Sequence, residues 1–250
     1  MNSHSLSKYV QAVVVNHNTS KYTELMLRSL FAHHSNPPDF AITILDNGSQ
    51  DGTRALENYA GEKGAIFRPS GFELKTAFNS HGEILRRFVL GHADCVYYLF
   101  LDADTCFIEH DTLNTMIREL EQDPSAFGIA PRLSSNGETE IPVEHWQTVY
   151  DSRLHPCCAL VKNTALFRRV VEEIGFSCVK YLWADHEEYF DTFQLMSRVM
   201  KTHDFRHIRS SKLVLHFFSV SYDWEPADAM AFKARLRDRF LEELQRVTFG

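Results

Sequence analysis

Residues 96–104 read Val-Tyr-Tyr-Leu-Phe-Leu-Asp-Ala-Asp, an apolar run that ends in two acids separated by one alanine. A continuous apolar and aromatic run of this length is typical of a strand covered on both faces in a parallel sheet. Two carboxylates directly after such a strand repel each other unless a cation pairs with them. Hard oxygen ligands suit Mg²⁺ or Mn²⁺, so we predict a divalent-metal site at Asp102 and Asp104. The alternative is a surface turn, where this acid pattern also occurs by chance.

Upstream of this pair, strands and helices alternate. The apolar runs predict strands at Val10–Val15, Ala41–Leu45, Ala65–Arg68 and Val96–Leu101. Helices are predicted between them, the first capped by Thr19 or Ser20 and the third at Ala77–Leu90. This order predicts an α/β fold with a Rossmann-like, mostly parallel central sheet flanked by helices. Ligands of such sheets bind beyond the carboxyl ends of the strands, where the polar stretches 16–20, 46–53 and 102–105 lie.

The second half of the chain is less regular. Strands are predicted at Phe127–Ala130, Ala159–Val161 and Leu213–Phe217. Helices are predicted after Asp111, which is expected to cap its helix, and at Asn163–Ile174, Tyr189–Thr202 and Pro226–Val247. We expect one domain over residues 1–250, with residues 226–247 as a C-terminal amphipathic helix.

Composition excludes several classes of protein. The net charge of −7 argues against a nucleic-acid partner. No apolar run is long enough to span a bilayer, and Met1–Tyr9 has no secretory core, so we expect a cytoplasmic location. The five cysteines lack C-x-x-C spacing and are read as buried small residues. The terminal helix interleaves basic and acidic residues, which indicates a solvated face, with peripheral attachment to anionic lipid as the alternative.

A second polar cluster, Asp46-Asn47-Gly48-Ser49-Gln50-Asp51-Gly52-Thr53, follows the second predicted strand. A turn and helix cap explain Asp51 and Gly52 but leave Asp46 unexplained. Together with Val13-Val14-Val15-Asn16-His17-Asn18 and Asp102-Ala103-Asp104, this cluster resembles the family-2 glycosyltransferases, whose signatures D-N-G-S-x-D-G-T and D-x-D occur in the same order. The resemblance extends over roughly the first 110 residues.

The resemblance implies a GT-A fold and a metal-dependent, inverting transfer of a sugar from a nucleoside-diphosphate sugar, most simply a UDP-sugar, to an acceptor hydroxyl. Asp46 is then expected to recognise the base and Asp104 to ligate Mn²⁺ or Mg²⁺, while Asp102 touches the ribose or the metal. His216, at the end of an apolar strand, is a third expected ligand, although a lone half-buried histidine is the commoner case. The implied donor-binding residues are Val15, His17, Asn18, Asp46, Asn47, Ser70, Lys75, Asn79, Asp102 and Ala103.

The family's catalytic base lies in the pattern E-D-x-D-L-x-x-R. Here the similar stretch is 191–198, Asp-Thr-Phe-Gln-Leu-Met-Ser-Arg, which keeps the first acid and the arginine but has Thr192 at the second acid. Asp191 is therefore the first candidate for the base, and a helix-cap acid is the alternative. The other candidates in the preceding acidic run are Asp185, Glu187 and Glu188.

We expect residues 8–106 to form the nucleotide-sugar-binding half and residues 107–222 a smaller acceptor-binding half. The acceptor itself, a saccharide, a small molecule or a protein, stays open. Its pocket is expected to involve His155, Cys157, Cys158 and Ala159, with Trp146 and Trp183 able to stack on a sugar unless they simply pack. Residues 16–20 lack the glycine-rich loops of pyrophosphorylases and dinucleotide-dependent oxidoreductases. A catalytically inactive nucleotide-sugar-binding or scaffold protein of the same fold remains the alternative.

Overall fold

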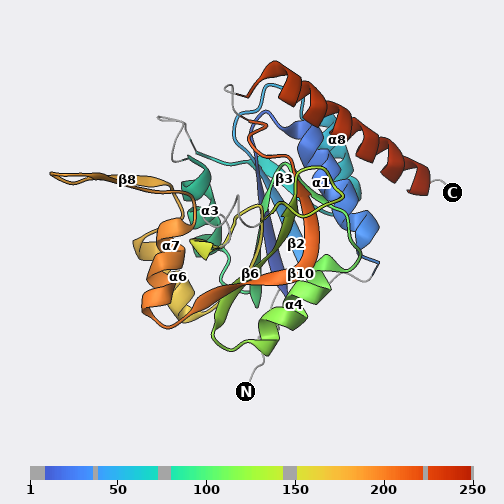
Figure 1. Ribbon diagram of the computed structural model, residues 1–250. Helices are drawn as coiled ribbons and strands as arrows, with labels where there is room; N and C mark the ends of the chain where they lie inside the picture. The colour runs from blue at the N-terminus through green and yellow to red at the C-terminus, as the bar shows by residue number, and fades with distance from the viewer. Residues whose placement is uncertain (1–8, 36–38, 73–79, 143–150, 222–224, 249–250) are drawn as a thin grey trace.

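The computed structural model describes residues 9–35, 39–72, 80–142, 151–221 and 225–248. Its centre is an eight-stranded sheet with the order β3-β2-β1-β4-β7-β6-β10-β5 (Figure 1). The first four strands in the chain lie together and are all parallel: β1 Val10–Asn16, β2 Phe40–Asp46, β3 Ile66–Pro69 and β4 Tyr97–Asp102. The sequence prediction for this half is confirmed.

The other half of the sheet mixes directions. Its strands are β5 Thr105–Phe107, β6 Ala126–Ser134, β7 Cys158–Lys162 and β10 Arg206–His216. Strand β7 runs antiparallel to both β4 and β6, and β5 runs antiparallel to β10, whereas β6 and β10 are parallel. The fold is therefore an α/β fold with a mostly parallel sheet, as predicted.

Helices cover both faces of the sheet. They are α1 Ser20–His33, α2 Arg54–Glu62, α3 Ser80–Gly91, α4 Thr112–Gln122, α6 Ala165–Glu173, α7 Gln194–Thr202 and α8 Ala227–Thr248. Alternate residues of β1 divide the core: Val10, Ala12 and Val14 pack with α1, α2 and α4, whereas Val13 packs in the cluster that contains α3, α6 and α7. Both faces of the central strands are thus buried, which explains their continuous apolar runs.

The terminal helix α8 lies against α1. Its Leu236 is buried with Tyr22 and Leu25 of α1, and Phe240 packs against the same cluster. Because this apolar side contacts the body of the protein, the structure gives no support for the alternative of peripheral lipid attachment through this helix. None of the described helices has the length and apolar character needed to cross a bilayer.

Two helix starts are capped differently from the sequence prediction. Neither Thr19 nor Ser20 caps α1 with its side chain; Asp51 accepts hydrogen bonds from the Ser20 N–H and hydroxyl, each at 2.7 Å. Asp111 has φ of 53° and makes no capping bond to α4, so that prediction was wrong. His34 accepts from the Leu113 N–H at 3.0 Å instead. In both cases a residue far along the chain satisfies an exposed helix-end donor.

The prediction of a helix over Tyr189–Thr202 was wrong in its first part. Residues Glu187–Phe190 form strand β9, which pairs antiparallel with β8, Val179–Leu182, in a separate two-stranded hairpin (Figure 1). Helix α7 begins only at Gln194, after Phe193, whose φ of 68° is left-handed. A left-handed residue cannot continue a right-handed helix, so the turn separates strand from helix.

Strand β10 carries a bulge opposite a proline. Ser210–Lys212 lie opposite Pro131 of β6, between the register pairs Arg209↔Ala130 and Leu213↔Arg132. Proline has no N–H to offer the ladder, which favours a bulge at this point.

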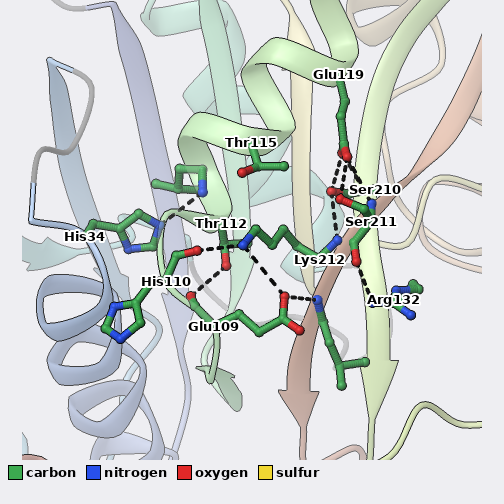
Figure 2. Close-up of polar contacts among 12 residues, drawn as sticks. His34, Glu109, His110, Thr112, Thr115, Glu119, Arg132, Ser210, Ser211 and Lys212 are labelled. Carbon is green, nitrogen blue, oxygen red and sulfur yellow. Dashed lines mark hydrogen bonds and ion pairs between the residues drawn. The ribbon is translucent and has the colours of Figure 1, made fainter.

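Side chains from α4 and the loop before it hold the bulge (Figure 2). Glu119 accepts from the hydroxyls of Ser210 and Ser211 and from the Ser211 N–H. Glu109 accepts from the Leu213 N–H at 3.1 Å, and the Lys212 ammonium donates to the His110 carbonyl at 2.8 Å. These bonds fix the register of the last part of β10.

Candidate active site

The polar stretches predicted at the sheet edge do meet. Register pairs Asn16 of β1 with Asp46 of β2, and Val15 of β1 with Asp102 of β4. Beyond these strand ends lies a cleft of about 440 Å³. The sequence-predicted residues that line it are Val15, His17, Asn47, Asp102, Ala103, Asp104, His155, Asp191 and His216. The structure therefore brings residues from both halves of the chain into one cavity.

Two acids and a histidine converge in this cleft. His216 Nε2 lies 3.1 Å from Asp104 Oδ1 and 3.6 Å from Asp102 Oδ2. All three side chains are largely buried, with 7% of His216, 11% of Asp104 and 20% of Asp102 exposed. Burial raises the pKa of Asp102. Burial lowers the pKa of His216, but the charges of Asp104 and Asp102 outweigh it, and the net pKa is raised.

This group of side chains fits a divalent cation. The ligand atoms of Asp102, Asp104 and His216 lie within 4.8 Å of one another. The Nδ1 atom of His216 is buried and has no hydrogen-bond partner among the described residues. Two carboxylate oxygens and one imidazole nitrogen form a donor set suited to Mn²⁺, and to Mg²⁺ with more oxygen ligands. His216, which the family resemblance implied as a third ligand, lies beside both acids.

His155 lines the cleft beside this group. Its ring centroid is 5.4 Å from that of His216. Burial holds its pKa well below the ordinary value, and its Nδ1 accepts from the Cys157 N–H at 3.3 Å. The expected neighbours Cys157, Cys158 and Ala159 are fully buried and do not line the cavity, so they are core residues.

Two residues that line the cleft, Arg153 and His81, were not predicted from the sequence. Arg153 pairs with Asp191, with Nη1 2.8 Å from Oδ2, and also donates to the Thr192 carbonyl at 2.8 Å. His81, at the start of α3, places Nε2 3.8 Å from Asp102 Oδ1. Neither lies in a recognisable motif.

Asp191 reaches the cleft, whereas the reserve acids do not. Asp185, Glu187 and Glu188 lie in the hairpin outside the cavity, and Glu188 pairs with Arg198 at 2.7 Å. Asp191 also accepts from the Thr192 N–H at 2.7 Å. Its side chain is 46% exposed, so it is open to a substrate while paired with Arg153.

The loops after β1 and β2 are tied to each other. The Asn16 amide donates to Asp46 Oδ1 and to the Ser49 hydroxyl, each at 2.9 Å. Asn18, with φ of 52°, accepts from the Gln50 N–H at 2.7 Å. The Asp46 carboxylate therefore orders its own turn and lies outside the lining of the cleft. This is a structural role that the sequence pattern did not reveal.

The remaining predicted donor residues lie apart from the cleft or outside the described residues. Ser70 donates to the Asn47 side chain at 2.9 Å and lines a neighbouring cavity with Arg87 and His92. Lys75, Asn79 and Trp146 fall outside the described residues.

Comparison with known proteins agrees with this geometry. The model of the family described as glycosyl transferase family 2 matches residues 11–205. The chain belongs to glycosyl transferase family 2. The match in this family-2 chain extends from β1 to α7. It includes Asp102 and Asp104 but not His216. No curated protein sequence matches the chain.

Solved structures share the fold at low sequence identity. The mannosyltransferase PcManGT from Pyrobaculum calidifontis, in complex with GDP-Man and Mn²⁺, has a TM-score of 0.60 at 15% identity, over 97% of this chain and 64% of that one. Glucosyl-3-phosphoglycerate synthase from Mycobacterium tuberculosis, with Mn²⁺ and UDP, has a TM-score of 0.52 at 13% identity, over 95% and 80%. TarS 1-349 from S. aureus, with UDP-GlcNAc, has a TM-score of 0.50 at 14% identity, over 92% and 66%. This family-2 chain thus has the GT-A fold and spans 64% and 66% of the length of two of these relatives.

Proposed function

We propose that the chain is a glycosyltransferase that moves a sugar from a nucleoside-diphosphate sugar, most simply a UDP-sugar, to an acceptor hydroxyl with inversion. The observation that carries this proposal is the convergence of Asp102, Asp104 and His216 in one cleft with Asp191. Family membership supports glycosyl transfer. Two fold relatives hold UDP or a UDP-sugar and one holds GDP-Man, which makes a nucleoside diphosphate the ligand to test.

Asp104 and His216, with Asp102, are the residues that would hold Mn²⁺ or Mg²⁺. Such a cation supplies positive charge that stabilises a leaving diphosphate. Val15, His17 and Asn47 line the same cavity on its β1–β2 side and are placed to contact the nucleoside. We assign residues 8–106 to the donor half and residues 107–222 to the acceptor half on this basis.

Asp191 is the proposed general base. The acceptor oxygen forms a bond to the anomeric carbon while the bond from that carbon to the diphosphate oxygen breaks. The electron pair leaves with the diphosphate, and the acceptor proton passes to the Asp191 carboxylate. Arg153, 2.8 Å away, holds this carboxylate in position beside the cleft. A single displacement inverts the anomeric centre and needs no nucleophilic side chain.

The second candidate is a nucleotide-sugar-binding protein without catalytic activity. It is favoured by the ion pair that engages the Asp191 carboxylate with Arg153, and by Thr192 at the position where the family has a second acid. Both candidates use the same donor site, so they differ only in turnover.

Calorimetric titration of UDP, GDP and their common sugar conjugates, each with Mn²⁺ and with EDTA, tests the donor site. We expect Mn²⁺-dependent binding of one nucleotide that is lost in Asp104→Asn. Release of the free nucleoside diphosphate from the bound sugar conjugate then separates the two candidates. Binding with release in the wild type, but without release in Asp191→Asn, supports the transferase. Binding that is never followed by release supports the binding protein, and no binding overturns both.

A further inference from the structure

The β8–β9 hairpin exposes an unusual share of apolar side chains. Among the described residues, half of the large hydrophobic residues that are exposed belong to it, with exposed fractions of 40% for Tyr181, 73% for Leu182, 55% for Trp183 and 57% for Tyr189. The hairpin projects from the body of the protein beside α7 (Figure 1). Contiguous exposed apolar surface of this kind usually marks a binding surface.

Strand pairing divides the hairpin into two faces. Tyr181, Trp183, His186 and Phe190 share the inner face, where Phe190 is buried and lies under the Arg198 guanidinium of α7. On this face the rings of Tyr181 and Trp183 stack at 6.2 Å, and those of Trp183 and His186 at 6.0 Å. The inner face therefore packs on α7 at its base and on itself toward its tip.

The outer face carries Lys180, Leu182, Glu187 and Tyr189. Register places Lys180 opposite Tyr189 and Leu182 opposite Glu187, so these four side chains point the same way. Lys180 and Glu187 form an ion pair at 2.5 Å. This face thus presents the exposed aromatic ring of Tyr189 and the exposed aliphatic side chain of Leu182. The charged pair of Lys180 and Glu187 lies beside them.

Tyr189 of the outer face lies two residues before Asp191, the proposed base, which lines the active-site cleft. Burial and the Asp191 charge raise the pKa of Tyr189 to about 12, while the Arg153 charge opposes this effect. Strand β9 ends at Phe190, so the outer face of the hairpin is joined through one residue to the lining of the cleft at Asp191.

The base of the hairpin is anchored next to the same cleft. Gly82, one residue after His81, has no side chain, and a Cβ there would lie 2.4 Å from the backbone of Ser177. The glycine therefore permits α3 and the segment that leads into β8 to touch. A surface anchored in this way can present a substrate to Asp191 in a defined position.

Charge and chemistry favour a saccharide on this surface. The hairpin has one lysine against Asp185, Glu187 and Glu188, so it should be repelled by an anionic lipid surface, which attracts basic residues. A sugar ring presents an apolar C–H face to an aromatic ring, and its hydroxyls pair with carboxylates and ammonium groups. The outer face offers both kinds of contact.

We propose that the acceptor is a saccharide bound along the outer face of the β8–β9 hairpin, with Tyr189 stacked on the sugar ring next to Asp191. This inference rests on the proposed glycosyl transfer. This names the substrate class of the acceptor half and assigns Tyr189 as a specificity-determining residue. The hydroxyl of the adjoining sugar is the one that Asp191 deprotonates.

The test uses the full chain with UDP or GDP, whichever binds, and Mn²⁺, titrated with maltohexaose, cellohexaose and chitohexaose. We expect one of these hexaoses to bind the wild type. Tyr189→Ala should weaken that binding about tenfold, the size of one good aromatic contact, and Tyr189→Phe should retain it. Trp183→Ala is the matched control, because it removes an exposed aromatic ring from the opposite face of the same hairpin, and it should leave the binding within about twofold.

Mn²⁺-dependent release of nucleoside diphosphate in the absence of acceptor reports on the donor site separately, and it should be unchanged in Trp183→Ala. Loss of hexaose binding in Trp183→Ala equal to that in Tyr189→Ala would overturn the assignment to the outer face. Intact nucleotide binding with no hexaose bound would overturn the saccharide proposal alone. A dimer in sedimentation velocity that Tyr189→Ala dissociates would assign the face to a second copy and also overturn it. Absence of nucleotide binding itself would count against the proposed function.

Discussion

Nε2 of His216 lies 3.1 Å from Oδ1 of Asp104, although 112 residues separate them in the chain. The contact exists because the antiparallel pairing of β10 with β5 places His216 opposite Thr105, the residue after Asp104. The last residue of β10 thereby reaches the acid pair at the end of β4.

Removing a carboxylate from the acid pair should abolish stabilisation by metal. In the wild type, Mn²⁺ at about 100 times its dissociation constant should raise the free energy of unfolding by about 2.7 kcal/mol. Asp104→Asn should show no such rise, because the neutral amide is a poor ligand for the cation. Thermal unfolding with Mn²⁺ and with EDTA measures this. Asp185→Asn, which neutralises an exposed acid of the hairpin, should keep the full rise; a rise retained in Asp104→Asn would exclude this metal site.

Glu119 should support the metal site from a distance. Glu119→Ala leaves the Ser211 N–H and two hydroxyls of the β10 bulge without their acceptor, which should cost about 1–3 kcal/mol of stability. Because the bulge sets the register of Leu213–His216, Mn²⁺ binding should weaken as well.

Urea unfolding and Mn²⁺ titration of the same variant separate the two effects of Glu119. Gln122→Ala, an exposed substitution on the same helix, should change stability by less than about 0.5 kcal/mol. A double-mutant cycle with Ser211→Ala should give a coupling energy of about 0.5–3 kcal/mol. Reduced stability with unchanged Mn²⁺ affinity would show that the bulge does not position His216.

Asp51 should behave as a helix cap supplied from another loop. Asp51→Ala removes the acceptor for the Ser20 N–H and hydroxyl, so the free energy of unfolding should fall by about 1–2 kcal/mol. Asp51→Asn keeps one acceptor oxygen and should lose less. Chemical denaturation measures both variants against Gln50→Ala, an exposed neighbour that should be nearly neutral. Equal stability of the alanine variants at the two positions would rule out the cap.

His33 should make folding sensitive to mild acid. Burial, with the charges of His110 and His34, lowers its pKa from 6.5 to about 4. Because the folded pKa is below the unfolded one, the unfolded state binds a proton at His33 before the folded state does. The free energy of unfolding is therefore highest above pH 6.5 and decreases as the pH falls toward 4. The full shift corresponds to about 3 kcal/mol, which solvent screening at this half-buried ring reduces to about 1 kcal/mol.

Urea unfolding of His33→Gln at several pH values between 4 and 8 tests this. The variant should show a flatter dependence of unfolding free energy on pH than the wild type. His203→Gln, at an exposed position, serves as the control and should follow the wild-type curve. Parallel curves for His33→Gln and wild type would mean that His33 does not titrate differently in the folded state.

Much of the parallel half of the fold could be predicted from the sequence. The strands that end at Asn16, Asp46 and Asp102 are continuous apolar runs, and each is followed by a polar turn. Since parallel strands bring their carboxyl ends to one edge, the location of the acids Asp102 and Asp104 followed from pattern alone. The helix caps could not be predicted in this way, because Asp51 and His34 act on donors in other elements.

The β8–β9 hairpin shows where periodicity misleads. The side chains of Phe193, Met196 and Met200 fit one helix face, and that pattern extends back to Tyr189 without interruption. Cross-strand pairing of Tyr189 with Lys180 and the left-handed backbone of Phe193 override it. The free energy of strand pairing depends on the partner strand, and a short stretch of sequence around Tyr189 does not contain that partner.

The sequence by itself determined which segments are buried strands, where each ends, and which acids follow them, because these features depend on local apolar pattern and turn chemistry. Only the tertiary structure decided that His216 meets Asp104, that Arg153 pairs with Asp191, and that Tyr189 pairs with Lys180 in a hairpin. Each of these contacts joins residues that are separated in the sequence. The arrangement that brings them together is selected by the packing free energy of the whole chain.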